Sequence, residues 1–400
     1  MNSATNQMLV LLALGLGACG GELPLDQGGS GGAGGTGGAG GDGGDTAFDW
    51  KLPAGIPKPK VPQDNPMTPA KVELGRHLFF DTRLSGNQTY SCGSCHEQAL
   101  AFTDGKAVSP GSTGELTPRS AMALTNVAYL SNLTWANPTV TSLEHQAKLP
   151  MFGEFPVELG LAGLEDELYQ RLRDEPLYAD LFLAAFPEGE GDRIDLANIL
   201  AAIACFERVL LSFDSPYDRL VYGGKPSAMS DAAKRGKDLF LSERTQCHHC
   251  HGGFNFSDQT THEGTTFVEE PFHNTGLYNI DGEGAYPEGN AGLFEISFEP
   301  EDMGRFRAPS LRNVAMTAPY MHDGTVASLE DVIDIYARGG RLVESGPFAG
   351  DGALNPFKSE FVAGFELSDD EKADLVEFLH ALTDDAFLTN PDFANPWKNL

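Results

Sequence analysis

The chain has 400 residues and a formal net charge of −30, with 27 basic and 57 acidic side chains. This length suits two domains of ordinary size. The strong negative charge argues against nucleic acid as a partner, because the acidic side chains outnumber those that could neutralise phosphates. The acidity is suited either to steering a basic protein partner or simply to solvating the surface.

The N-terminus has the features of a lipoprotein-type signal segment over residues 1–19. An apolar run at residues 8–18 is too short to span a bilayer but has the length of a signal-peptide core. The sequence Leu-Gly-Ala-Cys19 resembles a bacterial lipoprotein box, although residues 1–7 contain no Lys or Arg. We therefore expect export, with membrane contact only through a lipid anchor at Cys19.

Residues 20–66 are predicted to form a tether. Residues 20–45 are nearly all Gly with Ala, Ser, Thr and Asp, a composition that cannot bury a core and behaves as a flexible linker. Residues 51–66 are rich in Pro and favour an extended chain.

Two similar helix starts mark the beginning and the middle of the folded body. The Thr-Pro pair at 68–69 supplies an N-cap and a Pro at the first helical position, and predicts a helix to about Phe80. Ser230 opens a second helix. Both helices contain Gly-x-x-Leu-Phe, at 75–79 and at 236–240, followed by a short loop. We interpret this as an internal repeat.

Each copy of the repeat leads to a Cys-x-x-Cys-His motif: Cys92-Gly-Ser-Cys95-His96 and Cys247-His-His-Cys250-His251. Two thiols at this spacing can add across the two haem vinyl groups, and the adjacent His becomes an axial ligand of the iron. A redox Cys-x-x-Cys and half of a zinc site are the alternatives. Zinc would leave each His without a role, and no βαβ pattern of a thioredoxin-like site is visible. We predict two covalently bound c-type haems, and hence a location on the periplasmic side of a bacterial membrane.

The remaining chain predicts further helices and one long loop. Amphipathic stretches at 163–173 and 195–212 indicate helices, and residues 215–230, rich in Gly and Pro, indicate an interdomain connection. Residues 252–300 are rich in Gly, Asn and Pro, but their aromatic residues favour an ordered loop around the second haem. These aromatic residues are Phe254, Phe256, Phe267, Phe272, Tyr278 and Phe294.

Two helices are expected to begin after Ser328 and Ser368, with Asp331 and Glu371 in the capping-box place, the second being the last helix. Cys205 lies in an apolar run and is expected to be buried, which leaves no structural disulfide to form. The fold class is therefore mainly α, with two cytochrome c-like haem domains and long ordered loops. We predict an N-terminal, peroxide-activating domain over 67–225 and a C-terminal, electron-transferring domain over 226–400.

The axial ligands decide the chemistry, because an open haem iron binds peroxide and a closed one transfers electrons. No His occurs between His96 and His145, so the first haem is predicted to be open. For the second haem, Tyr336 shares the inward face of its helix with Leu329 and Ile333. Spacing alone favours a core Tyr, and the ligands that compete on residue type are Met303, Met316 and Met321.

The body from Thr68 to Leu382 resembles the bacterial di-haem cytochrome c peroxidase and MauG superfamily. The resemblance is carried by the two haem motifs and by residues 101–105, 307–314 and 317–324. Within the superfamily the chain looks most like the MbnH-type enzymes. That closer likeness rests on residues 134–138, 152–160, 252–258 and 272–278.

The resemblance implies roles for individual residues. Tyr336, fourteen residues beyond His322, stands where MauG-like enzymes have a Tyr ligand to the second haem and the peroxidases a Met. Trp135 looks like the Trp set between the haems. The residues that look like the distal pocket of the open haem are Gln146, Pro150 and Glu158, with Glu158 as acid–base catalyst. From its sequence neighbours alone, Glu158 reads equally as a surface carboxylate.

The superfamily also holds a calcium ion between its domains. Thr317 and Pro319 match the backbone ligands of that ion, but Ser120 stands in place of its Asn ligand. Calcium would then require Ser120 or a water to complete the site.

The resemblance implies a hydrogen-peroxide-dependent oxidoreductase that spreads two oxidising equivalents over both irons, as two Fe(IV) centres, and oxidises a Trp of an exported, MbnP-like partner to kynurenine. One alternative is a peroxidase that takes electrons from a small cytochrome, which Tyr336 in place of Met argues against. The other is a di-haem electron-transfer protein without catalysis, which would need a closed ligand set on both irons.

Overall fold

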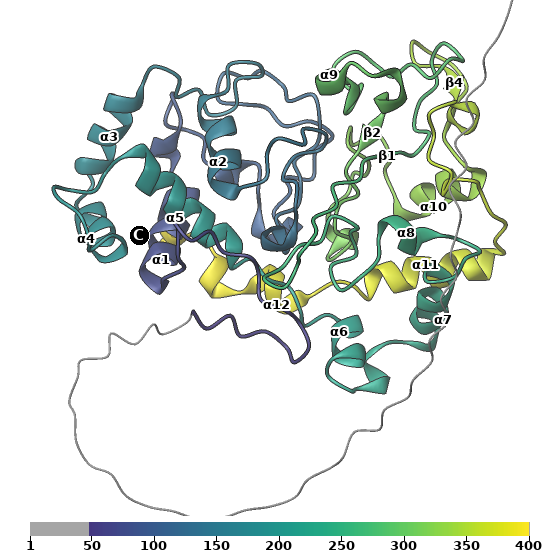
Figure 1. The fold of residues 1–400 in the computed structure, drawn as a ribbon, viewed down its shortest axis with the longest axis horizontal. Coiled ribbons are helices and arrows are strands. Elements are labelled where there is room, and N and C mark those ends of the chain that lie inside the picture. The colour runs from purple at the N-terminus through teal and green to yellow at the C-terminus, as the bar shows by residue number, and fades with distance from the viewer. Residues whose placement is uncertain (1–47, 400) are drawn as a thin grey trace, which may run out of the picture. The chain divides into compact units, whose positions relative to one another are not determined.

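The computed structural model describes residues 48–399, and they form a mainly α-helical body (Figure 1). The predicted signal segment, Cys19 and the Gly-rich tract lie outside the described residues. Within residues 48–399, no helix is both long and apolar enough to cross a membrane.

Helices dominate residues 48–399, and the strands there form two short antiparallel pairs. The helices before the second haem motif are α1 (Pro69–Phe79), α2 (Leu143–Phe152), α3 (Glu165–Arg173), α4 (Pro176–Ala185), α5 (Leu196–Arg208), α6 (Pro216–Val221) and α7 (Asp231–Phe240). From that motif onward they are α8 (Cys247–Cys250), α9 (Phe294–Ser297), α10 (Leu329–Arg338), α11 (Asp369–His380) and α12 (Asp385–Thr389). The strand pairs are β1 (His273–Asn274) with β2 (Arg305–Phe306), and β3 (Leu342–Val343) with β4 (Gly350–Asp351).

The predicted helix starts are confirmed by their caps. The Thr68 hydroxyl accepts from the Lys71 amide at the start of α1, and Ser230 caps α7 in the same way. Ser368 and Glu371 form the expected capping box of α11. At α10 the box is incomplete, because the Asp331 carboxylate accepts from the Ser328 hydroxyl rather than from its amide.

The repeated Gly-x-x-Leu-Phe marks the crossing point of two equivalent helix pairs. A Cβ on Gly75 of α1 would lie 1.9 Å from the Ala202 carbonyl oxygen of α5. A Cβ on Gly236 of α7 would lie 1.8 Å from the Asp374 carbonyl oxygen of α11. Only Gly permits such close backbone approach. The repeated sequence therefore corresponds to a repeated packing unit, α1 with α5 and α7 with α11.

Each helix pair contributes to its own buried core. The first core includes Phe79 and Phe206, whose rings are 5.2 Å apart, and the second includes Phe240 and Phe378, also 5.2 Å apart. Cys205 is fully buried, as predicted. We call the two packing units the N-terminal and C-terminal lobes.

The C-terminal end of the chain does not stay with the second core. The helix α11 was expected to be the last, but α12 follows it, and Phe387 and Phe393 are buried in the first core. The Trp397 indole donates to the His77 carbonyl of α1, 2.9 Å away. In Figure 1 the yellow end of the chain accordingly runs from α11 past α12 towards α1. The domain boundary at 225/226 remains a proposal, and residues 384–399 pack with the N-terminal lobe.

The predicted connection, residues 215–230, contains the short helix α6, which was not anticipated. The Asp218 carboxylate of α6 accepts hydrogen bonds from both Nη atoms of Arg312, at 2.9 and 3.0 Å. Both side chains are almost fully buried. Arg312 also donates to the Phe254 carbonyl in the long loop after the second motif. This buried pair ties the connection to the second haem loop.

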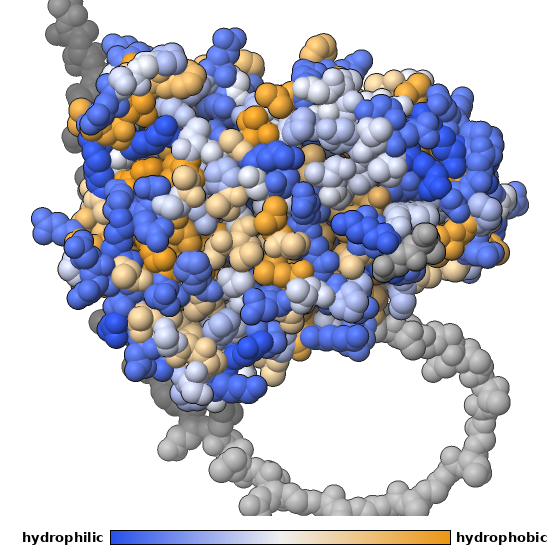
Figure 2. Space-filling view, turned by 180° about the vertical axis from the view of Figure 1, so that it is seen from behind, coloured by the Kyte–Doolittle hydropathy of each residue, from blue (hydrophilic) through white to orange (hydrophobic). Residues whose placement is uncertain are grey.

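That loop is held by only some of its aromatic residues. Phe256 and Tyr278 are buried, whereas Phe267 is 76% exposed. On the face shown in Figure 2, hydrophilic residues cover much of the surface and hydrophobic residues form scattered patches between them.

Candidate active site

The first motif opens into a small cavity, about 40 Å³, on the N-terminal lobe. Its wall contains Cys92, Cys95 and His96 together with the side chains that the sequence resemblance assigned to the distal pocket. Those side chains are Gln146, Pro150 and Glu158. Gln146 and Pro150 come from α2, and Glu158 follows in the loop after it. The fold thus brings a haem motif, an amide and a carboxyl group to one cavity.

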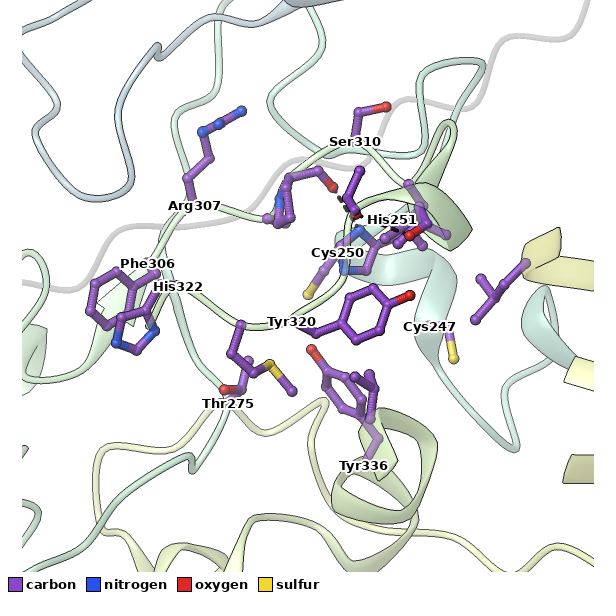
Figure 3. A pocket seen from close by; sticks show the side chains of 18 of the residues that line it. Cys247, Cys250, His251, Thr275, Phe306, Arg307, Ser310, Tyr320, His322 and Tyr336 are labelled. Atoms are coloured by element: carbon purple, nitrogen blue, oxygen red, sulfur yellow. Dashed lines mark hydrogen bonds between the residues drawn. The ribbon is translucent and has the colours of Figure 1, made fainter. Parts of the chain in front are cut away.

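The second motif lines a larger cavity of about 240 Å³ in the C-terminal lobe. Cys247, Cys250 and His251 lie on one wall, and Tyr336 of α10 lies on another. Figure 3 shows the Tyr336 hydroxyl directed into the space that these residues surround. Leu329 and Ile333 of the same helix also line this cavity. The predicted inward face of α10 is therefore the face that meets the second motif.

Both motif histidines are held in the tautomer that a metal ligand needs. His96 Nδ1 donates to the Phe102 carbonyl at 2.7 Å. His251 Nδ1 donates to the Phe256 and Pro309 carbonyls at 3.2 and 3.1 Å. A carbonyl can only accept, so the proton is on Nδ1 and the Nε2 lone pair is free to bind iron. Burial also lowers the pKa of both rings, which keeps them neutral.

The loops that supply these carbonyls share an unusual backbone conformation. Phe102 has φ +64° and Phe256 has φ +51°, in the left-handed region that non-glycine residues avoid at a cost of about 1–2 kcal/mol. Each turns its carbonyl towards the motif His of its own lobe. The repeat of this conformation indicates that holding the imidazole compensates for the strain.

Several features of the cavities fit a haem. The four motif cysteines are free thiols, and each lines one of the two cavities. Arg307 Nη1 and His322 Nε2 line the larger cavity, and both are buried without a hydrogen-bond partner. Thiols, free imidazole nitrogens and unpaired polar atoms together suit a covalently attached group that carries a metal and acidic substituents.

Of the three methionines considered as alternative ligands, the fold places one in the cavity of the second motif. Met321 lines the same cavity as Tyr336, whereas Met316 packs against the first core and Met303 against a third cluster. Burial raises the pKa of the Tyr336 phenol well above its ordinary value. A nearby cation would be required to ionise this phenol, which is the condition for it to act as an anionic ligand.

Trp135 lies at the larger cavity rather than the smaller one. Its indole nitrogen donates to the Ser120 carbonyl at 2.9 Å, and its ring meets the His322 ring edge-on at 6.5 Å. His322 is stacked on Phe306 at 3.6 Å, as Figure 3 shows, and burial lowers its pKa to about 3. His322 is therefore a neutral ring in this wall.

The residues that the resemblance suggests for calcium lie in the wall of the larger cavity. Thr317, Pro319 and Ser120 all line the larger cavity. The Ser120 hydroxyl lies within hydrogen-bonding distance of the Met321 and His322 carbonyls, at 3.2 and 3.4 Å. Serine thus stands beside backbone oxygens, the type of ligand that calcium uses.

Sequence reasoning missed one ionisable residue, Glu207. It lines the smaller cavity with Glu158, and its Oε2 is buried without a partner. Burial raises the pKa of Glu207 to about 8. Helical spacing could have found it, because Leu200 and Ile203 precede it at i−7 and i−4 on the buried face of α5.

Comparisons with known proteins identify the family of this chain. Residues 69–226 match the family model of di-haem cytochrome c peroxidase. The chain is 36% identical over 351 residues to a cytochrome-c peroxidase, IdrP1, of Pseudomonas sp. (strain SCT), covering 82% of this chain and 85% of that protein. It is 34% identical over 335 residues to the methylamine utilization protein MauG of Methylorubrum extorquens, covering 83% of each.

The chain belongs to the di-haem cytochrome c peroxidase and MauG family. It is therefore an enzyme that acts on peroxide and carries two haems. Among solved structures, a MauG-like protein associated with microbial copper homeostasis is 51% identical, with a TM-score of 0.86. That match covers 88% of this chain and 100% of the other. The mainly α fold with two haem lobes is confirmed.

Proposed function

We propose that this enzyme uses hydrogen peroxide to oxidise a Trp of a separate exported protein to kynurenine. The observation that carries the proposal is the position of Tyr336, which lines the cavity of the second haem motif. An anionic oxygen ligand favours high oxidation states of iron, and so favours storing oxidising power over rapid exchange with a cytochrome. The 51% identity to a MauG-like protein associated with copper homeostasis supports the same assignment.

In this proposal His96 would hold the first haem iron, attached through Cys92 and Cys95, and His251 and Tyr336 would hold the second, attached through Cys247 and Cys250. When bound, the haems supply an iron centre that takes two oxidising equivalents from hydrogen peroxide and a second centre that shares them.

The protein's own part is to manage protons at the first cavity. Burial raises the pKa of Glu158, so its carboxyl takes up and returns a proton more readily near neutral pH. We assign it the transfer of the peroxide proton from one oxygen to the other. Gln146 lines the same cavity and is suited to orienting the peroxide by its amide. Pro150 offers no backbone donor at this point of the wall.

We assign Trp135 the role of carrying electrons between the two haems. Its ring lies in the wall of the second cavity and its indole nitrogen is fixed on the Ser120 carbonyl. Electrons from a partner Trp would enter at the protein surface, so no substrate pocket beside a haem is required. The partner would be an MbnP-like protein in the periplasm, met by an enzyme anchored through Cys19.

The alternative function is a cytochrome c peroxidase that reduces hydrogen peroxide with electrons from a small cytochrome. Two observations favour it. The chain is 36% identical to the named peroxidase IdrP1. Met321 lies in the same cavity as Tyr336, and a Met ligand suits electron acceptance at high potential. The second alternative, a non-catalytic electron carrier, gives no role to the carboxyl and amide beside the first motif.

A calcium ion held by the carbonyls of Thr317 and Pro319 remains part of the proposal. Removing it with a chelator should lower the activity, and added calcium should restore it. If the untreated protein contains no more calcium than the buffer, and chelation leaves its activity unchanged, the ion is not present.

The test of the function mixes the purified protein, hydrogen peroxide and the exported protein encoded beside it, and examines tryptic peptides by mass spectrometry. Kynurenine in place of one Trp is expected only when all three are present. Tyr336→Phe should abolish the product while both haems stay attached, because Phe preserves the volume but removes the ligand oxygen.

Tyr320→Phe is the matched control, since Tyr320 lines the same cavity and should be dispensable. Fast oxidation of reduced cytochrome c with an unmodified partner would instead establish the peroxidase alternative. Equal kynurenine yields from the two Tyr variants would return Tyr336 to the role of a core residue.

A further inference from the structure

The second haem motif carries two histidines that neither cavity uses for its iron. His248 and His249 are the variable residues of this motif and lie on α8. Their ring nitrogens meet the carboxylate of Glu243, which lies in the turn after α7. His249 Nε2 is 3.1 Å from Glu243 Oε2, and His248 Nε2 is 3.4 Å from Glu243 Oε1.

These two distances, one to each carboxylate oxygen, fit hydrogen bonds and also fit ligands around one metal ion. In a tetrahedral site with bonds of about 2.0–2.1 Å, neighbouring ligand atoms are about 3.3 Å apart. The two nitrogen–oxygen distances already match this value. One ligand atom from each of the three residues lies within 4.8 Å of the other two.

The arrangement is also held in place. The two imidazole rings lie 4.4 Å apart, and the His249 ring is stacked on Phe361 at 4.5 Å with an angle of 16° between the planes. Cys247 and Cys250 flank the pair, so attachment of a haem would fix the backbone on both sides. The site is reachable, because the side chains of His248 and His249 are 25% and 30% exposed.

An ordinary ion pair does not account for Glu243. Within residues 48–399, no Lys or Arg forms an ion pair with its carboxylate. Among the described residues, the side chains that meet its carboxylate are His248 and His249. The carboxylate is thus directed at two imidazole nitrogens.

We propose that Glu243, His248 and His249 bind one divalent transition-metal ion of the zinc or copper(II) type at the surface of the C-terminal lobe. Two imidazole nitrogens and one carboxylate oxygen suit both ions, and the usual order of affinities places copper(II) above zinc. With three protein ligands, a fourth position stays open to water. This inference does not depend on the identity of the substrate.

The test uses the untagged holoprotein with both haems attached, because a His-tag would itself bind metal. The protein is freed of metal with a chelator, dialysed against zinc chloride and, separately, against copper(II) chloride, and its metal content is measured by mass spectrometry. The wild type should retain one more ion per chain than His249→Gln and Glu243→Gln, which should bind that ion at least about tenfold more weakly.

The control is His380→Gln, which changes an exposed His on α11 and should bind metal like the wild type. The haem absorbance spectrum verifies that each variant is folded. Equal metal content in the wild type and in His249→Gln would overturn the proposal, as would a loss of the ion in His380→Gln.

Discussion

At the scale of single residues, the first cavity contains two carboxyl groups in different surroundings. Glu158 is partly exposed, and only burial raises its pKa. Glu207 is almost completely buried, and its pKa rises to about 8. The first can exchange protons with solvent, whereas the second is kept neutral at pH 7. We therefore expect the two residues to respond differently to removal of the charge.

Replacing Glu158 with Gln should slow peroxide activation by roughly 10²–10⁴-fold, because the amide is nearly isosteric but cannot take up a proton. The resting absorbance spectrum should barely change. Stopped-flow mixing with hydrogen peroxide measures the rate. If Glu158→Gln activates peroxide at the wild-type rate, Glu158 is a surface carboxylate and not the acid–base catalyst.

Replacing Glu207 with Gln should change the pH dependence of stability. The native state keeps the Glu207 proton up to about pH 8, whereas the unfolded chain loses it near the ordinary value of 4.5. Stability of the wild type should therefore fall as pH rises between these two values. Gln cannot ionise, so its advantage should grow to on the order of a few kcal/mol by pH 9.

The measurement is the midpoint of thermal unfolding of both proteins at pH 5, 7 and 9. Parallel curves for the wild type and Glu207→Gln would mean that Glu207 is ionised in the native protein. Arg208, its neighbour on α5, pairs with Glu144, and its charge lowers the pKa of Glu207 by less than burial raises it.

Among the elements, the close helix crossings predict the direction in which a Gly-to-Ala change alters stability. Helix propensity would make the change stabilising, whereas a clash at the crossing would make it destabilising. Gly to Ala inside a helix ordinarily stabilises by about 0.5–1 kcal/mol. At Gly236 the added Cβ would lie 1.8 Å from the Asp374 carbonyl oxygen, a backbone atom that cannot turn away. Gly236→Ala should therefore destabilise the protein by about 1–3 kcal/mol or more.

Denaturant unfolding followed by the absorbance of the haems tests this, with Lys234→Ala on the same helix as the control. The Lys234 ammonium forms an ion pair with the Asp231 carboxylate at 3.0 Å, one turn earlier on the same helix, and an exposed pair of this kind contributes only about 0–1 kcal/mol. A stabilised Gly236→Ala would show that α7 and α11 are not in close contact.

The elements also show how far local sequence signals extend. Caps and the repeated Gly-x-x-Leu-Phe predicted α1 and α7, because those signals lie within a few residues of each helix start. The partners α5 and α11 could not be paired with them from sequence, since the contacts join residues more than a hundred positions apart. The helix α12 was missed for the same reason: Phe387 and Phe393 gain their burial from the distant first core.

The candidate site divides in the same way. The haem motifs could be read directly, because the chemistry of attachment requires a fixed spacing. The distal group was suggested only by family resemblance, and the fold brings Gln146, Pro150 and Glu158 to one cavity with His96. Glu207 was missed because a charged residue at the end of an amphipathic helix ordinarily faces solvent, and its burial depends on the packing of α5.

At the scale of the whole molecule, the two lobes repeat one design with different outcomes. Each has a crossed helix pair, a strained Phe that holds the motif His, and a cavity. The first cavity faces the motif with Glu158 and Gln146, and the second faces it with Tyr336. One scaffold thus provides both a site suited to peroxide and a site suited to a closed iron.

We propose that the first haem is open and that Tyr336 closes the second. Electron paramagnetic resonance of the resting ferric protein tests it most directly, because an iron with one protein ligand and an iron with two give different spin states. The claim predicts one high-spin and one low-spin signal of equal amount, with the low-spin signal altered in Tyr336→Phe and retained in Tyr320→Phe. Two low-spin signals without a high-spin component would contradict it.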